Sequence, residues 1–162
     1  MTTTKNTIWE ILEKVLDPEV PVLSILDLGI VRAVKMDSEN RPEIIITPTY
    51  TGCPAMNVIE VNIKSVLQEH GYQIVKVTTV LSPAWTTDWL TEAGRKKLKA
   101  YGIAPPVGTS VDKTALFQEK KVPCPICDSL NTKMVSQFGS TACKAHYQCK
   151  ECLEPFDYFK CH

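Results

Sequence analysis

The first apolar pattern along the chain has the spacing of a helix. Its members are Ile8, Ile11, Leu12, Val15 and Leu16. Residues three and four positions apart lie on one face of a helix, so this pattern predicts an amphipathic helix with a buried stripe. Thr7 followed by Glu10 fits a capping box, and Pro18 cannot continue a helix. We therefore expect a helix that begins near Thr7 and ends before Pro18.

Two strands and a tight turn are predicted next. Residues 30–36 are mostly apolar and predict the first strand. DSENRP at 37–42 is polar and predicts a hairpin turn. EIIITPT at 43–49 predicts the second strand. Because its apolar residues are continuous rather than alternating, we expect this strand to be buried on both faces.

A helix, a third strand and a last helix complete this part of the pattern. Helical spacing predicts a helix over 54–69, with Pro54 at its first position, where no N–H is needed. Gly71 is expected to end this helix in a left-handed conformation. YQIVKVTTVL at 72–81 predicts the third strand, and residues 88–101 predict the last helix.

The order of these elements predicts two domains. The order α-β-β-α-β-α over residues 1–102 predicts a small α/β domain with a short mixed sheet. Residues 103–121 mix proline, glycine and charge without periodicity, which predicts a linker. Residues 122–162 change to cysteine, aromatic residues and short strand-like pieces, which predicts a second, smaller β module.

Composition and charge narrow the functional classes. The chain has 162 residues, 44% of them apolar, with 18 Lys and Arg against 18 Asp and Glu. This balance provides no basic excess for binding nucleic acid or an anionic membrane surface. The first residues lack the apolar core of a signal peptide, and no apolar run is long enough to span a bilayer. We therefore expect a cytoplasmic protein that binds neither nucleic acid nor a membrane.

Seven cysteines are distributed unevenly, with six of them in the last 39 residues. An odd count in a cytoplasmic chain argues against a disulfide framework and for metal or thiol chemistry. Cys124 and Cys127 form one Cys-x-x-Cys pair, and Cys149 and Cys152 form another after 21 intervening residues. Each pair can direct two thiolates toward one tetrahedral ion. We therefore predict a zinc-ribbon-like module in which these four cysteines bind zinc.

This four-cysteine module is expected to be structural. A segment this short buries too little apolar surface to fold alone, and bound zinc would supply roughly 10 kcal/mol or more. Iron with the same ligands and buried free thiols are the alternatives. Cys143, Cys161 and His162 remain, and they suit either a second metal or thiol site or a buried thiol and a frayed chain end.

Cys53 lies alone in the first 123 residues, between a glycine and a proline at the predicted start of a helix. Unpaired backbone N–H groups and the helix dipole at that position favour an anionic thiolate. Such a thiolate suits a nucleophile or a ligand for a soft metal, although a free cysteine is also often a small buried apolar residue. Thr47 and Thr49 are two apart on the preceding strand, so we expect their hydroxyls to line the approach to Cys53.

Three acidic residues are expected near this thiol. Asp17 and Glu19 flank Pro18 in a loop that we expect near the sheet edge, and Asp27 precedes the first strand. A carboxylate disfavours a nearby thiolate but helps to hold a cation, so the combination favours metal handling over covalent catalysis. No histidine is placed by the sequence to act as the base for a cysteine nucleophile.

These motifs resemble those of a known family. DPEVPVLSILDLGIV, TPTYTGCP and LSPAWTTDWLT resemble segments of SufT-like iron–sulfur cluster assembly and targeting factors, and the resemblance covers residues 8–102. With the cysteine-rich tail included, nearly the whole chain resembles the D-protein family of bacterial phenylacetate degradation. The resemblance implies that Cys53 is the functional thiol.

The resemblance also implies an accessory protein rather than an enzyme. The phenylacetate system contains a multicomponent oxygenase that converts phenylacetyl-CoA into its ring-1,2-epoxide, with a di-iron site in the oxygenase and a [2Fe–2S] cluster in the reductase. We therefore expect a maturation factor that transiently holds iron or an Fe–S cluster through Cys53, with the oxygenase and reductase subunits as partners. Because one thiol cannot hold a cluster, a homodimer, a partner or a small thiol would supply further ligands. The alternatives are a structural or docking subunit of the oxygenase and a thiol enzyme.

Overall fold

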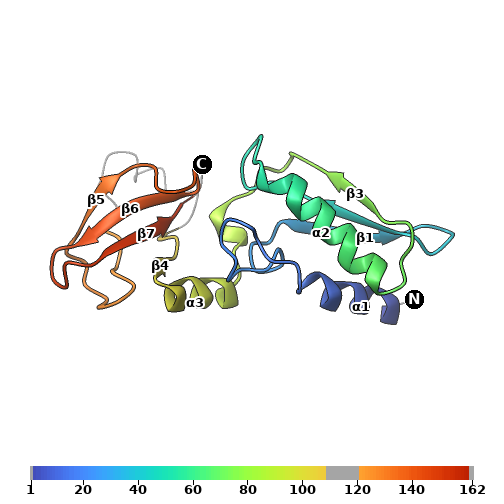
Figure 1. Cartoon of the computed structure of the whole chain (residues 1–162), viewed down its shortest axis with the longest axis horizontal. Helices are drawn as coiled ribbons and strands as arrows, with labels where there is room; N and C mark the ends of the chain where they lie inside the picture. The colour runs from blue at the N-terminus through green and yellow to red at the C-terminus, as the bar shows by residue number, and fades with distance from the viewer. Residues whose placement is uncertain (1, 109–120, 161–162) are drawn as a thin grey trace. The chain divides into compact units, whose positions relative to one another are not determined.

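The computed structural model describes residues 2–108 and 121–160, and the chain divides into two compact units (Figure 1). Unit 1 is Met1–Trp85 and unit 2 is Thr86–His162. The sequence pattern placed the corresponding boundary at residue 102, whereas residues 86–102 group with the C-terminal part of the chain. Within the described ranges, no helix has the length and apolar character needed to cross a membrane.

Unit 1 contains two helices and a three-stranded mixed sheet. Its elements are α1 (Thr2–Leu12), β1 (Val31–Met36), β2 (Pro42–Ile46), α2 (Ala55–Glu69) and β3 (Lys76–Thr79). The strand order is β1-β2-β3, with β1 antiparallel and β3 parallel to β2. The predicted small α/β architecture with a short mixed sheet is therefore confirmed.

Both helices cover one face of this sheet, and the core of unit 1 lies between the two layers. α1 contacts α2 and β1, and α2 contacts β3 (Figure 1). The fully buried core residues include Ile8, Leu12, Ile44, Ile46, Ile59, Ile63 and Leu67. On β2, Glu43 and Ile45 alternate with these buried residues and are only half-buried. The expectation that this strand is buried on both faces is therefore wrong, because the helices cover one face only.

α1 differs from the predicted helix at both ends. The helix begins at Thr2 rather than near Thr7, and no proline or glycine interrupts the residues in between. It ends at Leu12, so Leu16 does not belong to the buried stripe. Leu16 is 46% exposed and pairs with Ser24 in an isolated β-bridge.

α2 ends at Glu69, and Gly71, two residues later, has a φ of 95°, the left-handed conformation predicted for it. The N–H of Gly71 donates to the Gln68 carbonyl and the N–H of Tyr72 donates to the Leu67 carbonyl, both at 3.0 Å. This is a Schellman motif, which needs a left-handed residue after the helix. Glycine adopts that conformation without strain.

Unit 2 begins with a broken helix. The expected helix over 88–101 is a 3-10 turn at Thr87–Trp89 followed by α3 (Glu92–Tyr101). The Thr91 hydroxyl accepts the N–H of Gly94 at 3.0 Å. The prediction of one continuous helix is therefore wrong, because Thr91 provides an N-cap that starts a new helix.

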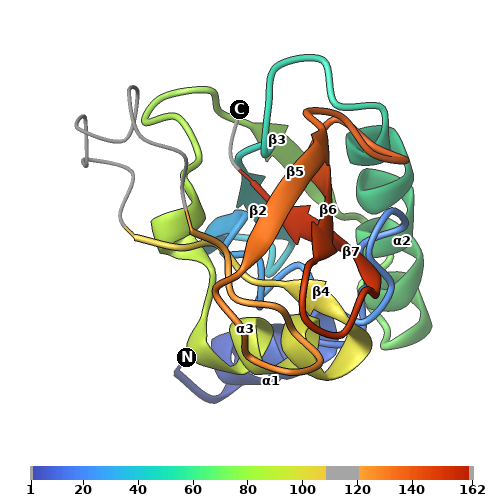
Figure 2. The same ribbon diagram turned by 90° about the vertical axis from the view of Figure 1, so that its left-hand side faces the viewer.

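The rest of unit 2 is a four-stranded sheet (Figure 2). Its strands are β4 (Ile103–Ala104), β5 (Thr132–Ser136), β6 (Lys144–Cys149) and β7 (Pro155–Phe159), in the order β4-β7-β6-β5. β5, β6 and β7 are antiparallel neighbours, and β4 joins β7 in parallel. Residues 103 and 104, which we expected in the linker, are thus part of the sheet. One core cluster contains Ala104, Val122, Cys124, Ala145, Tyr147, Cys149, Phe156 and Tyr158.

Candidate functional site

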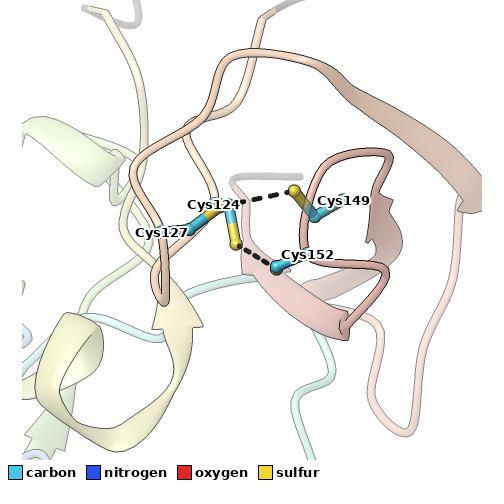
Figure 3. Close-up of side chains that lie close together, drawn as sticks. All are labelled: Cys124, Cys127, Cys149 and Cys152. Carbon is cyan, nitrogen blue, oxygen red and sulfur yellow. Dashed lines mark hydrogen bonds between the residues drawn. The ribbon is translucent and has the colours of Figure 1, made fainter.

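The two Cys-x-x-Cys turns of unit 2 are closed by backbone hydrogen bonds. In the first turn, the N–H of Cys124 donates to the Ser129 carbonyl and the N–H of Asp128 donates to the Cys124 carbonyl, both at 2.9 Å. In the second turn, the N–H of Cys149 donates to the Glu154 carbonyl at 3.0 Å. These bonds shape the backbone so that the two turns present their thiols to each other (Figure 3).

The four thiols of these turns converge. The Sγ atoms of Cys124 and Cys152 are 3.7 Å apart, and those of Cys127 and Cys149 are 3.5 Å apart. All four lie within 4.8 Å of one another, and no other group of this kind occurs in residues 2–108 and 121–160. A tetrahedral ion with metal–sulfur bonds of about 2.3 Å places its ligands about 3.8 Å apart. The cluster therefore fits an ion of the size of zinc.

The crowding of these sulfurs favours a bound cation. Burial raises the pKa of Cys149, but the N–H groups of Cys152 and Glu151 and the neighbouring thiols outweigh it and lower this pKa to about 7. At Cys152 the N–H of Glu154 lowers the pKa, but burial and the adjacent thiols overcome it and raise the pKa to about 12. One thiol ionises at the expense of its neighbour, because close thiolates repel each other. A divalent cation removes this conflict.

Burial divides the four cysteines into two kinds. Cys124 and Cys149 are fully buried in the core cluster, whereas Cys152 is half-buried and Cys127 is exposed. The buried pair attaches the site to the sheet of unit 2. An ion with four sulfur ligands has no open coordination position, so this site suits a metal that holds the ribbon together.

Cys53 of unit 1 immediately precedes the proline that leads into α2. Its N–H donates to the Tyr50 carbonyl at 3.2 Å, and its carbonyl accepts the N–H of Met56 at 3.2 Å. Gly52 has a φ of 80°, a conformation that glycine adopts readily. Cys53 thus lies directly before Pro54, the N-cap residue of a 15-residue helix. Its side chain is buried, with 8% exposed.

Segments that are distant in the sequence meet at the end of the sheet where β2 leads toward Cys53. β2 and β3 are parallel, and just beyond them the N–H of Val80 donates to the Ile46 carbonyl at 2.9 Å. The N–H of Thr47 donates to the Ile30 carbonyl at 2.8 Å, beside the start of β1. The carboxyl ends of parallel strands are a common place for ligands in α/β proteins.

Trp85 connects a third segment to this edge. Its indole Nε1 donates to the Leu28 carbonyl at 2.7 Å, and the side chain is 5% exposed. Sequence reasoning did not place this tryptophan at the site, although the motif LSPAW directly after the third strand is its signal. Hydrogen bonds therefore join residues 28–30, 46–47 and 80–85 at this edge.

Thr47 carries an unusual buried hydroxyl at this edge. It is 1% exposed, and its Oγ1 has no hydrogen-bond partner among the described residues. Such a group costs roughly 1–3 kcal/mol and is rare in folded proteins. β2 ends at Ile46, and Thr49 lies beyond it in a bend, where its side chain is half-buried. The expectation that both threonines lie on one strand face is therefore wrong, since Pro48 between them has no N–H for the ladder.

The two aspartates predicted near the thiol shape loops. Asp17 is buried, and its Oδ1 accepts the N–H groups of Glu19 at 2.7 Å and Val20 at 2.8 Å. Asp27 is buried, and its Oδ2 accepts the N–H of Ser24 at 3.0 Å while the Ser24 hydroxyl accepts the N–H of Asp27 at 3.0 Å. These are capping interactions that fix the turns. Glu19 is half-buried. Cation binding by these carboxylates stays a prediction.

The second metal or thiol site also stays a prediction. Cys143 is buried, and its Sγ lies 3.2 Å from the Thr141 hydroxyl. Cys161 and His162 lie outside the described residues.

Comparison with known proteins assigns both units. The family described as "Iron-sulfur cluster assembly protein" matches residues 5–79, and the "PaaD zinc beta ribbon domain" matches residues 108–160. A protein of Escherichia coli (strain K12), named as a subunit of a "Putative 1,2-phenylacetyl-CoA epoxidase", is 48% identical over 156 residues, which cover 96% of this chain and 92% of that protein. The chain belongs to the PaaD family.

Other relatives of this PaaD-family chain match its N-terminal part. "Fe-S protein maturation auxiliary factor YitW" of Bacillus subtilis (strain 168) is 36% identical over 85 residues, which cover 52% of this chain and 82% of that protein. The crystal structure of a "Domain of Unknown Function DUF59 from Bacillus anthracis" is 29% identical, with a TM-score of 0.56 over 60% of this chain and 92% of that one. Both resemblances inferred from the motifs are therefore confirmed.

Proposed function

We propose that this protein is an accessory factor in the maturation of a phenylacetyl-CoA ring-1,2-epoxidase, and that Cys53 transiently holds iron or an Fe–S cluster in that process. Relatives named as an epoxidase component and as Fe–S maturation auxiliary factors support an accessory role. The observation that carries the role of the thiol is the position of Cys53 at the N-terminal end of α2, close in sequence to the unpartnered Thr47 hydroxyl.

The chemistry of this edge suits a transient ligand rather than a catalyst. Cysteine sulfur is the usual protein ligand for iron in Fe–S clusters. A single thiol cannot hold a cluster, so an oxygenase or reductase subunit, a second copy of this chain or a small thiol would complete the coordination. The Thr47 hydroxyl would donate a hydrogen bond to a bound sulfide or thiolate, since its Oγ1 has no hydrogen-bond partner among residues 2–108 and 121–160.

The metal of unit 2 has a separate, structural role in this proposal. Zinc bound by Cys124, Cys127, Cys149 and Cys152 would hold the ribbon together. With all four positions occupied by sulfur, it would not exchange with the iron that Cys53 handles. Zinc content should therefore be independent of Cys53.

The test compares Cys53→Ser with a control substitution in cells that express the complete epoxidase system. We expect Cys53→Ser to lower the iron content of the oxygenase or the [2Fe–2S] content of the reductase several-fold, because serine has nearly the same size but is a poor ligand for iron. Ser65→Ala changes an exposed side chain on α2 and should leave both contents unchanged. Full iron and cluster loading with Cys53→Ser would remove the thiol from the mechanism.

A docking subunit without a metal-handling role is the second candidate. Three large apolar side chains on or next to the metal turns are more than half exposed, namely Ile126, Leu130 and Leu153. A contiguous patch of such side chains would mark an interaction surface. In this case Leu153→Asp would reduce binding to the oxygenase, while Cys53→Ser would leave the activity of the complex normal.

A further inference from the structure

Residues 86–107 lie between the parts of the chain that match the two families, which end at residue 79 and begin at residue 108. These residues, the α3–β4 segment, nevertheless belong to unit 2. We infer that the α3–β4 segment is an outer support of the four-cysteine metal centre, so that metal binding and docking of this segment depend on each other. The inference is independent of the role proposed for Cys53.

β4 attaches the segment to the core around the thiols. It pairs with β7, where Ala104 lies opposite Tyr158. Ala104 is fully buried in the core cluster that also contains Cys124 and Cys149. Just beyond β4, the N–H of Val107 donates to the Tyr158 hydroxyl at 3.1 Å. Two of the four predicted metal ligands therefore share a core with the segment.

Arg95 of α3 forms hydrogen bonds to both ends of the α3–β4 segment. Its Nη1 donates to the Pro106 carbonyl at 2.9 Å, and its Nη2 donates to the Thr87 carbonyl at 3.1 Å. A planar guanidinium that bridges two carbonyls fixes their relative positions. The beginning and the end of the segment are thus held together, and α3 docks as one piece with β4.

Lys99 connects α3 directly to the first metal turn. Its Nζ lies 2.5 Å from Oδ1 of Asp128, the residue after Cys127. Asp128 has a φ of 59°, and its N–H closes the turn on Cys124. A divalent ion with four thiolates carries a net charge of about −2, and Asp128 adds negative charge beside it. Lys99 offsets part of this charge, so it should favour the metal-bound state.

A cavity of about 310 Å³ lies where the segment meets the first metal turn. The segment lines it with Lys99, Pro106 and Val107, and the turn lines it with Pro123, Cys124 and Asp128. The contact between segment and turn is therefore incompletely packed, and the missing contacts weaken it. Docking of the α3–β4 segment then depends on the shape of the first metal turn, and a bound ion would maintain that shape.

These contacts imply a thermodynamic coupling. In small metal-binding modules the site does not exist before folding, so the free energy of metal binding is also free energy of folding. If the segment docks on the metal-shaped turn, metal binding stabilises the docked segment. Coupling of this kind is reciprocal, and weaker docking lowers the metal affinity by the same factor.

Hydrogen exchange of the full chain tests the first half of this coupling. Removal of zinc by a chelator is expected to accelerate amide exchange in residues 92–104 at least tenfold, because the docked state is lost. Exchange in α2 of unit 1 serves as the reference and should not change. Unaltered exchange in 92–104, or an equal acceleration in α2, would overturn the inference.

Competition for zinc between the full chain and a chromophoric chelator tests the second half. Lys99→Ala is expected to weaken zinc binding two- to fivefold, the range of an exposed ion pair next to a charged site. Lys99→Arg keeps the charge and should restore the affinity. Lys96→Ala removes an exposed cation from the same helix and is the matched control. Equal affinities in the Lys99→Ala and Lys96→Ala variants would contradict the coupling.

Discussion

Replacement of Thr47 by valine tests whether the sheet edge of unit 1 is built to accept a ligand. The side chain is 1% exposed, and its Oγ1 lacks a hydrogen-bond partner within the described part of the chain. Valine has nearly the same shape without the hydroxyl. Most substitutions of buried residues destabilise a protein. This one removes a hydroxyl that forms no hydrogen bond with the described residues, so it should stabilise unit 1.

The expected gain follows from the burial of this single group. An unpaired buried hydroxyl costs roughly 1–3 kcal/mol. Imperfect packing of the new methyl group offsets part of this amount, so we expect a net gain of about 1 kcal/mol for Thr47→Val. For a unit of 85 residues, this corresponds to a rise in Tm of about 4–8 °C.

The assay must follow unit 1 separately, because two compact units need not unfold together. Urea unfolding of the full chain, followed by hydrogen exchange of the α2 amides, provides this signal. Thr78→Val is the matched control, since the Thr78 hydroxyl donates to the Glu43 carboxylate at 2.6 Å. The same chemical change there removes a hydrogen bond and should destabilise the protein.

The two possible outcomes for Thr47→Val have distinct meanings. A more stable variant that delivers less iron or cluster to its client would show that the hydroxyl is kept for a ligand at the expense of stability. A loss of stability of about 1 kcal/mol or more would refute the reasoning. It would mean that the hydroxyl is hydrogen-bonded in the folded protein.

Three further predictions concern local interactions. Chelation of the metal should abolish the β-sheet signal of unit 2 in circular dichroism while unit 1 stays folded, because the ribbon depends on its ion. Thr91→Ala removes the N-cap of α3 and should lower the stability of unit 2 by about 1 kcal/mol in urea unfolding, with Thr132→Ala as a comparison at a hydroxyl that caps no helix. The Thr78 hydroxyl, together with Lys76, lowers the pKa of Glu43. The contribution of ionised Glu43 to the free energy of unfolding is fully present above pH 4.5 and is lost as the pH falls through the lowered pKa. Thr78→Val should therefore make the free energy of unfolding, measured in urea, fall less steeply below pH 4.5.

Local signals predicted some features of the chain correctly and failed at others for identifiable reasons. Gly71 adopts a left-handed conformation after α2 as expected, because a left-handed helix cap depends on one residue type at one position. Thr7 did not start α1, because a capping box is worth little against the continuation of a helix that packs on the sheet. The break before α3 was missed, although Thr91 is a strong N-cap residue, because helical spacing continues across it.

The candidate sites also contain features that local sequence predicted and features that it did not. Residue type and spacing identified the four cysteines, because a Cys-x-x-Cys turn is formed by the backbone of a few consecutive residues. The position of Cys53 before a helix also followed from the flanking glycine and proline. The sequence did not predict that the Thr47 hydroxyl lacks a hydrogen bond to the described residues. Whether a buried hydroxyl is hydrogen-bonded depends on how distant segments pack around it.

The amino-acid sequence by itself determined the order of helices and strands in unit 1, the set of four clustered cysteines and the family, because these depend on periodicity and on residue types a few positions apart. Only the tertiary structure decided which face of β2 is buried, which loops surround the sheet edge before Cys53, and that α3 and β4 join the ribbon. These features arise from contacts between residues that are far apart in the sequence. The free energy of burying such contacts exceeds the local preferences of any single segment.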